Sequence, residues 1–385
     1  MPRSLGIGLA IAILAGLSLF AFALDGGRIG KSLVLGALFG IVLQRSRFCF
    51  LCHTRDFLSG GDVRGVAAIL LALVVGTLGY HVLFGAWLPD PTSGRLPPDA
   101  HIGPVGPVLA LAAFVFGIGM AVSGSCISGH LYRLGEGSPT APFALLGAIA
   151  GFALGFLSWN TLYVTSIATA PVIWLPAHLG YTGWLVLQLA AIAALAVLLA
   201  WRSTLPAPAA PVEGAPALHH AANRIFRDRW PATVGGAAVG VLATVAYFQV
   251  QPLGVTAAIG SYARSVLASL GALPETLHGL DGFAGCRTAL VSGFTPNGAF
   301  ILGLVLASFA AALAAGQFTP ARPTVSQAMR GVVGGVLLGW GAMTAIGCTV
   351  GTLLSGTIAG AASGWIFLFA SFAGVAITLR LLPAR

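Results

Sequence analysis

GIGMAVSGSCISG, residues 117–129, and GWGAMTAIGCTVG, residues 339–351, are two copies of one pattern that align without a gap. Each copy places a single cysteine, Cys126 or Cys348, among glycines inside an uncharged apolar run. Glycines let helices approach closely and allow a helix to break. Two broken apolar segments at matching places in two halves of a chain are typical of the substrate site of a membrane transporter.

The composition supports a membrane protein. Of the 385 residues, 57% are hydrophobic and only 8% are charged, whereas about a quarter of the residues in a soluble domain are charged. Residues 331–379 carry no formal charge at all. Because apolar runs long enough to cross a bilayer recur along the chain, we expect an all-α polytopic membrane protein.

About ten transmembrane spans are predicted. The fourth span should be broken near Cys126, and residues 254–270 are too short to span and read as a re-entrant or interfacial helix. The predicted spans are residues 5–24, 32–50, 65–87, 107–134, 141–166, 183–201, 232–250, 298–318, 331–360 and 363–381.

The chain divides into two halves. Residues 1–31 hold an extra N-terminal span, which we expect to be retained although it resembles a signal segment. Residues 32–201 form the first transmembrane repeat and residues 231–385 the second, joined by a flexible cytoplasmic linker rich in proline and alanine, residues 202–230. The repeat includes GALFG at 36–40 and GAAVG at 236–240, so Phe48 faces Phe248. Partner spans are five apart, an odd number, which predicts an inverted-topology repeat around a central path.

The net charge of +9 comes almost entirely from arginines that flank the spans. A soluble protein with this charge could bind nucleic acid, but here the positive-inside bias accounts for it. Alternation of the spans then puts Arg133 and the linker arginines on the cytoplasmic side, and both termini as well. All ten carboxylates fall outside the predicted spans or at their ends, which disfavours a cation substrate or obvious ion coupling.

The candidate substrate site combines thiols with backbone amides. A helix break exposes amide groups that can bind an anion, and a thiol beside them adds a weak, polarizable donor. A third thiol, Cys49, follows the basic stretch QRSR, and its repeat counterpart is Gln249, so the two halves are not equivalent. The candidate substrate-binding residues are Cys49, Cys126, Cys348, Gly124, Gly129, Gly347 and Gly351.

Other readings of the cysteines and histidines are weaker. Cys49 and Cys52 could serve a membrane-embedded thiol oxidoreductase or sulfurtransferase. With the following histidine they match the C-x-x-C-H haem pattern, but haem attachment needs the outer compartment, and no second ligand pair supports zinc. Cys286 lies in a predicted loop with no partner by pattern, and His130 is expected to hydrogen-bond at a helix end. We therefore predict no catalytic residue, no metal and no cofactor.

Residues 43–50 (LQRSRFCF), 116–137 (FGIGMAVSGSCISGHLYRLGEG) and 338–356 (LGWGAMTAIGCTVGTLLSG) resemble the YeeE/YedE sulphur-transport family, and the match runs from about residue 32 to residue 380. The resemblance implies a bacterial inner-membrane permease that takes up thiosulfate. It also implies that Cys49, Cys126 and Cys348 line a central path and relay the ion, and that a small cytosolic sulfur-carrier protein of the SirA/TusA type is a partner. The chain departs from the family at Ser123-Gly124-Ser125, where a glycine pair is expected.

Overall fold

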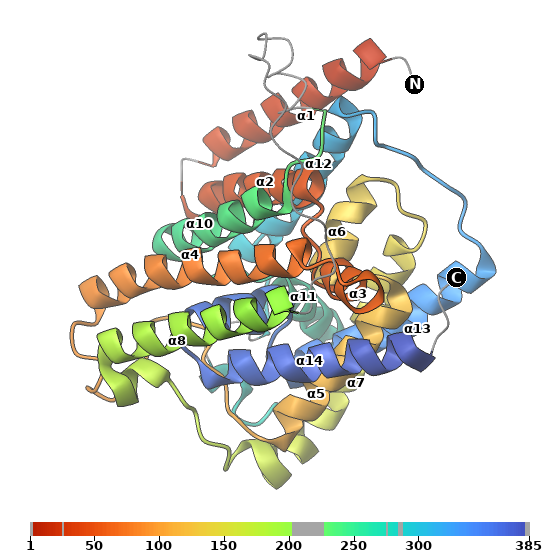
Figure 1. Ribbon diagram of the computed structural model, residues 1–385. Coiled ribbons are helices and arrows are strands. Elements are labelled where there is room, and N and C mark those ends of the chain that lie inside the picture. Colours follow the sequence, from red (N-terminus) through yellow and green to blue (C-terminus); the bar gives the residue numbers. More distant parts are fainter. Residues whose placement is uncertain (1–2, 25–26, 202–226, 275, 284–287, 382–385) are drawn as a thin grey trace, which may run out of the picture.

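The computed structural model describes residues 3–24, 27–201, 227–274, 276–283 and 288–381. These residues form helices and no strand, with two isolated bridge pairs (Figure 1). The helices are α1 (Arg3–Ala23), α2 (Arg28–Ser46), α3 (Phe50–Gly60), α4 (Arg64–Trp87), α5 (Pro107–Ser123), α6 (Ile127–Gly135), α7 (Ala141–Leu162), η1 (Tyr163–Ile167), α8 (Leu175–Trp201), α10 (Ala232–Gln249), α11 (Thr256–Ser269), η2 (Leu280–Gly282), α12 (Pro296–Ala314), α13 (Val325–Thr344), η3 (Thr349–Gly356) and α14 (Ala362–Leu381).

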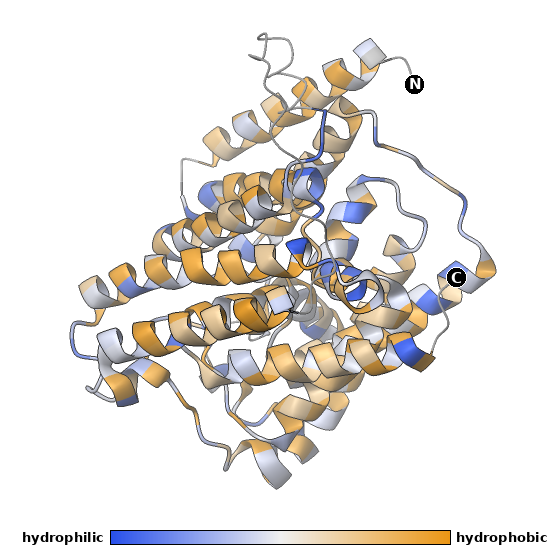
Figure 2. Cartoon of the chain, in the orientation of Figure 1, coloured by the Kyte–Doolittle hydropathy of each residue, from blue (hydrophilic) through white to orange (hydrophobic). Residues whose placement is uncertain are grey.

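The predicted all-α polytopic membrane protein is confirmed. Among the described residues, nine segments are long and apolar enough to cross a membrane, and ten if the bent pair α13 and η3 counts as one span. The helix α11 has only 14 residues and is not among them, as expected for residues 254–270. Apolar residues cover the long helices, while hydrophilic residues gather near helix ends and around α3 (Figure 2).

Among the described residues, three spans are broken directly before a cysteine, one more than the sequence indicated, and α8 is also kinked at Gly180. The predicted break near Cys126 separates α5 from α6, and a bend of 43° separates α13 from η3. The span predicted over residues 32–50 is present as α2, but its helix stops before residue 50. The helix α2 ends at Ser46 because Arg47 adopts a left-handed backbone with φ of 50°, and α3 starts separately at Phe50.

Helix packing follows the predicted repeat. The most extensive contacts join α7 to α13, α2 to α12, α5 to α13, α5 to α14 and α4 to α10. Exchanging α2 with α10, α4 with α12, α5 with α13 and α7 with α14 converts this set of pairs into itself. Such a contact pattern is what a two-fold inverted repeat produces. The outer helices α1 and α8 exchange in the same way, because α1 packs on α12 and α8 packs on α4, the exchange partner of α12.

Glycines bring the paired helices into backbone contact. A side chain at Gly36 of α2 would collide with the backbone carbonyl of Phe300 in α12, and one at Gly236 of α10 would collide with that of Ala68 in α4. These are the two glycines that open the matching GALFG and GAAVG segments. Close approach of this kind maximises van der Waals contact between helices in a bilayer, where lipid tails compete with apolar side chains.

The two ends of the helical region lie on the same side of the molecule. In Figure 1 the start of α1 and the end of α14 both lie at the right, as an even number of crossings requires. Residues 202–226, most of the proposed linker, lie outside the described residues. At its end, Trp230 donates its backbone N–H to the carbonyl of Arg45 over 3.0 Å, which fastens the start of the second half to α2. The domain boundaries remain predictions.

Candidate functional site

The three predicted site cysteines share one local structure. Cys49, Cys126 and Cys348 each stand in extended backbone directly before a short helix, at the N-caps of α3, α6 and η3. Each is buried, with at most 1% of its surface exposed. Each therefore lies where a helix begins and where backbone N–H groups lack helical partners.

The chain turns in the same way before each cysteine. The residue two positions earlier has a positive φ in all three cases: 50° at Arg47, 90° at Gly124 and 52° at Ile346. The long helix ends one residue before this left-handed residue in α2 and α5 and two residues before it in α13, and a single residue then leads to the cysteine. A repeated turn of this kind presents each thiol at the start of a new helix.

Side-chain contacts link the starts of the three short helices. The Cys49 sulfur lies 3.6 Å from the Ser125 hydroxyl, next to Cys126. Cys126 in turn lies 3.2 Å from the Ser128 hydroxyl and beside the side chain of Thr349, the residue after Cys348. The structure thus brings α3 and α6 of the first half together with η3 of the second half.

Two of the predicted glycines keep the space around the thiols open. A side chain at Gly129 would collide with the Ser125 hydroxyl and lie 3.5 Å from the Cys126 sulfur. A side chain at Gly347, which has φ of 154°, would collide with Thr352. Both positions therefore require glycine, for space at the first and for backbone conformation and space at the second.

The other two predicted glycines form parts of the backbone frame. Gly124 closes α5, and its carbonyl accepts a hydrogen bond from Arg133 over 3.1 Å. Gly351 is buried in η3, three residues after its cysteine. Thus all four glycines lie at the helix breaks or in the first turn that follows them.

Backbone amides of the short helices face the thiols. Cys126 lies near the amide of Gly129, and Cys49 near the amide of Cys52, without meeting the geometry of a side-chain cap hydrogen bond. Because the N-terminal amides of α3 and α6 have no helical acceptor, they can donate to an anion, and the helix dipole favours negative charge there.

The second half offers no fourth thiol, and the predicted pairing of Cys49 with Gln249 is wrong. Gln249 is exposed at the last position of α10, where it accepts a hydrogen bond from Lys31 over 3.0 Å. The loop before α11 is longer than the loop before α3, so a constant offset misaligns them. Val255, the buried N-cap of α11, takes the position of Cys49.

Arg133 was not predicted as a site residue, yet it lies beside the thiols. Its Nη2 donates to the Cys52 sulfur over 2.9 Å, and its charge is within electrostatic reach of Cys49. In the sequence, the positive-inside bias alone accounts for Arg133. Only the three-dimensional contact between α6 and α3 separates it from the other arginines.

Polar residues on α6 and just after it complete the surroundings. His130 lies with its Nε2 3.0 Å from the Ser123 hydroxyl at the end of α5, which confirms the expected helix-end hydrogen bond. Just beyond α6, the Glu136 carboxylate accepts a hydrogen bond from Gln44 over 3.2 Å, and burial raises its pKa above the usual range. Cys286 lies outside the described residues.

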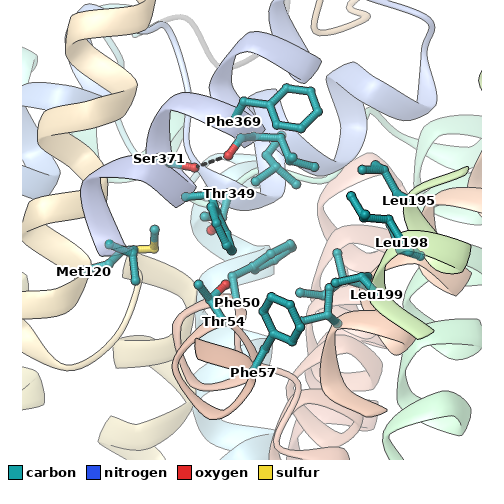
Figure 3. Close-up of a pocket in the computed structure, with 17 residues that line it drawn as sticks. Phe50, Thr54, Phe57, Met120, Leu195, Leu198, Leu199, Thr349, Phe369 and Ser371 are labelled. Carbon is teal, nitrogen blue, oxygen red and sulfur yellow. Dashed lines mark hydrogen bonds between the residues drawn. The ribbon is translucent and has the colours of Figure 1, made fainter. Parts of the chain in front are cut away.

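An apolar cavity of about 320 Å³ lies beside this site, between α3, α4, α8 and α14 (Figure 3). The rings of Phe50, Phe57 and Phe369 and the side chain of Leu198 face it, and Thr349 is at its wall. Because its lining offers few polar groups, it cannot replace the hydration of an anion.

A polar cavity of about 270 Å³ lies at another place, around the loop before α11 and the loop between α4 and α5. Arg28, Asp99 and His101 line it. Among the described residues no group of three or more histidine, cysteine and acidic side chains could hold a metal ion.

Known proteins resemble this chain over most of its length. Residues 45–377 match the family described as Sulphur transport. The chain is 30% identical over 364 residues to the thiosulfate transporter TsuA of Spirochaeta thermophila, covering 88% of this chain and 94% of the relative. It is 28% identical over 367 residues to TsuA of Escherichia coli, covering 90% and 92%. It is also 26% identical over 196 residues to the probable transporter YedE of Escherichia coli, covering 49% and 45%.

Proposed function

The chain belongs to the sulphur-transport family, and from this membership we propose that it takes up a small sulfur-containing anion, thiosulfate first, across the bacterial inner membrane. Two full-length relatives are named thiosulfate transporters. Membership in this family makes the chain a transporter and not an enzyme, so we set aside the alternative reading of Cys49 and Cys52 as a thiol oxidoreductase or sulfurtransferase.

The observation that supports this proposal best is the burial of three thiols, each at the start of a short helix. A dianion that leaves water for the interior of a membrane protein loses several kcal/mol of hydration for each charge. Neutral S–H groups and unpaired amides at the starts of α3 and α6 can donate hydrogen bonds in its place. These donors are neutral dipoles, so each holds the ion less tightly than a full positive charge would.

We propose that the anion passes along the thiols in the order given by their contacts. Cys348 precedes Thr349, Thr349 lies beside Cys126, and Ser125 joins Cys126 to Cys49. Gly129 keeps room between them. Each step is an exchange of hydrogen-bond donors to the anion, so no covalent bond forms or breaks.

The orientation in the membrane is also a proposal. We place both termini in the cytoplasm, because the arginines that flank the spans then lie on the cytoplasmic side. The start of α1 and the end of α14 lie on one side of the molecule (Figure 1), which agrees with this arrangement. A small cytosolic sulfur carrier of the SirA/TusA type would then receive the ion at this side, and copurification with the transporter tests that partner.

Uptake of labelled thiosulfate tests the function. Cells that lack their own route are given the wild-type chain or one of three variants, Cys49→Ala, Cys126→Ala and Cys348→Ala. We expect wild-type uptake and a loss of at least tenfold in each variant at equal abundance in the membrane. Ser18→Ala, at an exposed position of α1, is the control for substitution itself. No uptake by the wild type would reject thiosulfate, and normal uptake by Cys126→Ala and Cys348→Ala would reject the thiol relay.

A further inference from the structure

Arg133 presents a guanidinium to the thiol-bearing helix α3. It lies in the last turn of α6, and its side chain is partly buried. Nη2 donates to the Cys52 sulfur over 2.9 Å and Nη1 to the Gly124 carbonyl over 3.1 Å. Nε points to the Tyr132 hydroxyl at 3.4 Å, and the guanidinium also lies 5.9 Å from the centre of that ring.

Among the described residues no carboxylate oxygen lies within 4.0 Å of this charge, and Glu136, three residues further along, interacts with it only at longer range. Among the described residues, the arginines with a carboxylate oxygen within 4.0 Å are Arg55, Arg64 and Arg264. Arg264, on α11, holds Asp281 at 2.9 Å, although it is also largely buried. Arg133 has instead a thiol, a carbonyl and a phenol. A partly buried cation without a counter-ion in contact is costly in a membrane protein, and such residues commonly mark an ion pathway.

The groups that now accept hydrogen bonds from Arg133 are uncharged, and they do not use all of its donors. A guanidinium has five N–H donors, and a thiol sulfur is a poor acceptor. The three contacts occupy three of these donors. A sulfur oxyanion accepts two parallel N–H bonds far better, because charge-assisted pairs are shorter and about twice as strong as neutral ones.

Arg133 lies beyond the thiols, at one end of the proposed ion path. Cys52 lies one helical turn after Cys49 on α3. Arg133 lies seven residues after Cys126, at the other end of α6, which is about 10 Å along a helix. An anion that moves from Cys126 past Cys49 therefore approaches the guanidinium that Cys52 occupies.

We propose that Arg133 is an anion-binding subsite at the end of the proposed ion path, next to Cys49. At this subsite a divalent sulfur oxyanion displaces the Cys52 sulfur from the guanidinium. This inference rests on the proposed function. The empty protein keeps the Arg133 donor on a neutral thiol, so the subsite is held in shape without a competing carboxylate. Binding there supplies a full positive charge, which the thiols and amides lack.

The test compares variants in half-saturation for labelled thiosulfate, measured from initial uptake rates in cells without their own route. Arg133→Gln should raise the half-saturation concentration at least tenfold, and Arg133→Lys should raise it at least threefold, because a lysine cannot form the two-pronged contact. Arg55→Gln is the matched control. It removes the same charge from α3, but Arg55 is exposed and paired with Asp56, so we expect wild-type half-saturation.

A second readout separates binding from folding. Purified wild-type protein should show a thiosulfate-dependent rise in thermal midpoint, which Arg133→Gln should lose while its midpoint without thiosulfate stays near that of the wild type. A half-saturation within twofold of the wild type in Arg133→Gln would overturn the subsite. If that variant does not reach the membrane, Arg133→Lys decides, and wild-type half-saturation there overturns the subsite. Absence of uptake by the wild type would instead reject the proposed function.

Discussion

Arg47 and Ile346 have the same left-handed backbone, with φ of 50° and 52°, and each stands two residues before a buried cysteine. Neither is a glycine, although a left-handed conformation costs a residue with a side chain about 1 kcal/mol or more. Gly124 takes the same place before Cys126 with φ of 90°. The turn that presents each thiol is therefore formed at some cost in two of its three occurrences.

The backbone strain at Arg47 can be measured directly. Its side chain is exposed, so a substitution there removes little packing. We expect Arg47→Gly to be about 1 kcal/mol more stable than Arg47→Ala, since glycine adopts this conformation without penalty. Thermal unfolding in detergent compares the two variants. The opposite order of midpoints would show that the left-handed turn is not under strain.

This turn explains why the sequence revealed two of the three helix breaks. Glycines around Cys126 and Cys348 predicted broken helices, and both breaks exist. Before Cys49 the left-handed residue is an arginine, which no pattern distinguishes from a membrane-edge anchor. The repeat was read correctly from its glycines because close backbone contact demands them, as at Gly36. A constant offset fails at Gln249 because the loop before α11 is longer than the loop before α3.

Gly129 should be essential for uptake and dispensable for insertion. A methyl group there would collide with the Ser125 hydroxyl and crowd the Cys126 sulfur, which lies 3.5 Å from the added carbon. We expect Gly129→Ala to lower thiosulfate uptake at least tenfold while its abundance in the membrane stays near that of the wild type. Gly85→Ala is the matched control, because a side chain at Gly85 of α4 meets no atom within 4 Å. Equal uptake by both variants would show that the space beside Cys126 is not used.

His101 should make the protein sensitive to acid. It is buried in the loop between α4 and α5, and burial lowers its pKa to about 4. An unfolded histidine titrates near pH 6.5. Its contribution to stability is therefore complete above pH 6.5 and is lost as the pH falls toward 4, because only the unfolded chain takes up the proton. The loss amounts to about 3 kcal/mol.

Thermal unfolding at pH 7.5 and pH 4.5 tests this effect. We expect a smaller fall in midpoint for His101→Asn than for the wild type, because the variant has no imidazole to protonate. His178→Asn, at an exposed position of α8, controls for the loss of a histidine. An unchanged pH dependence in His101→Asn would mean that other groups cause the acid sensitivity.

The apolar cavity of Figure 3 should not be part of the ion path. It lies beside Thr349 and has room for several water molecules. The side chains that face it, such as Leu198 and Phe369, offer no hydrogen bond. An anion there would lose its hydration without replacement. We expect Leu198→Trp, which fills the cavity from α8, to keep wild-type uptake of labelled thiosulfate, because the thiols and Arg133 remain as they are. Figure 3 shows Met120 on the side of the cavity away from Leu198, so Met120→Leu, which keeps the volume, is the control for disturbance near the thiols. Loss of uptake in Leu198→Trp at normal abundance in the membrane would show that the ion path runs through this cavity. It would also contradict the proposed role of the cysteines.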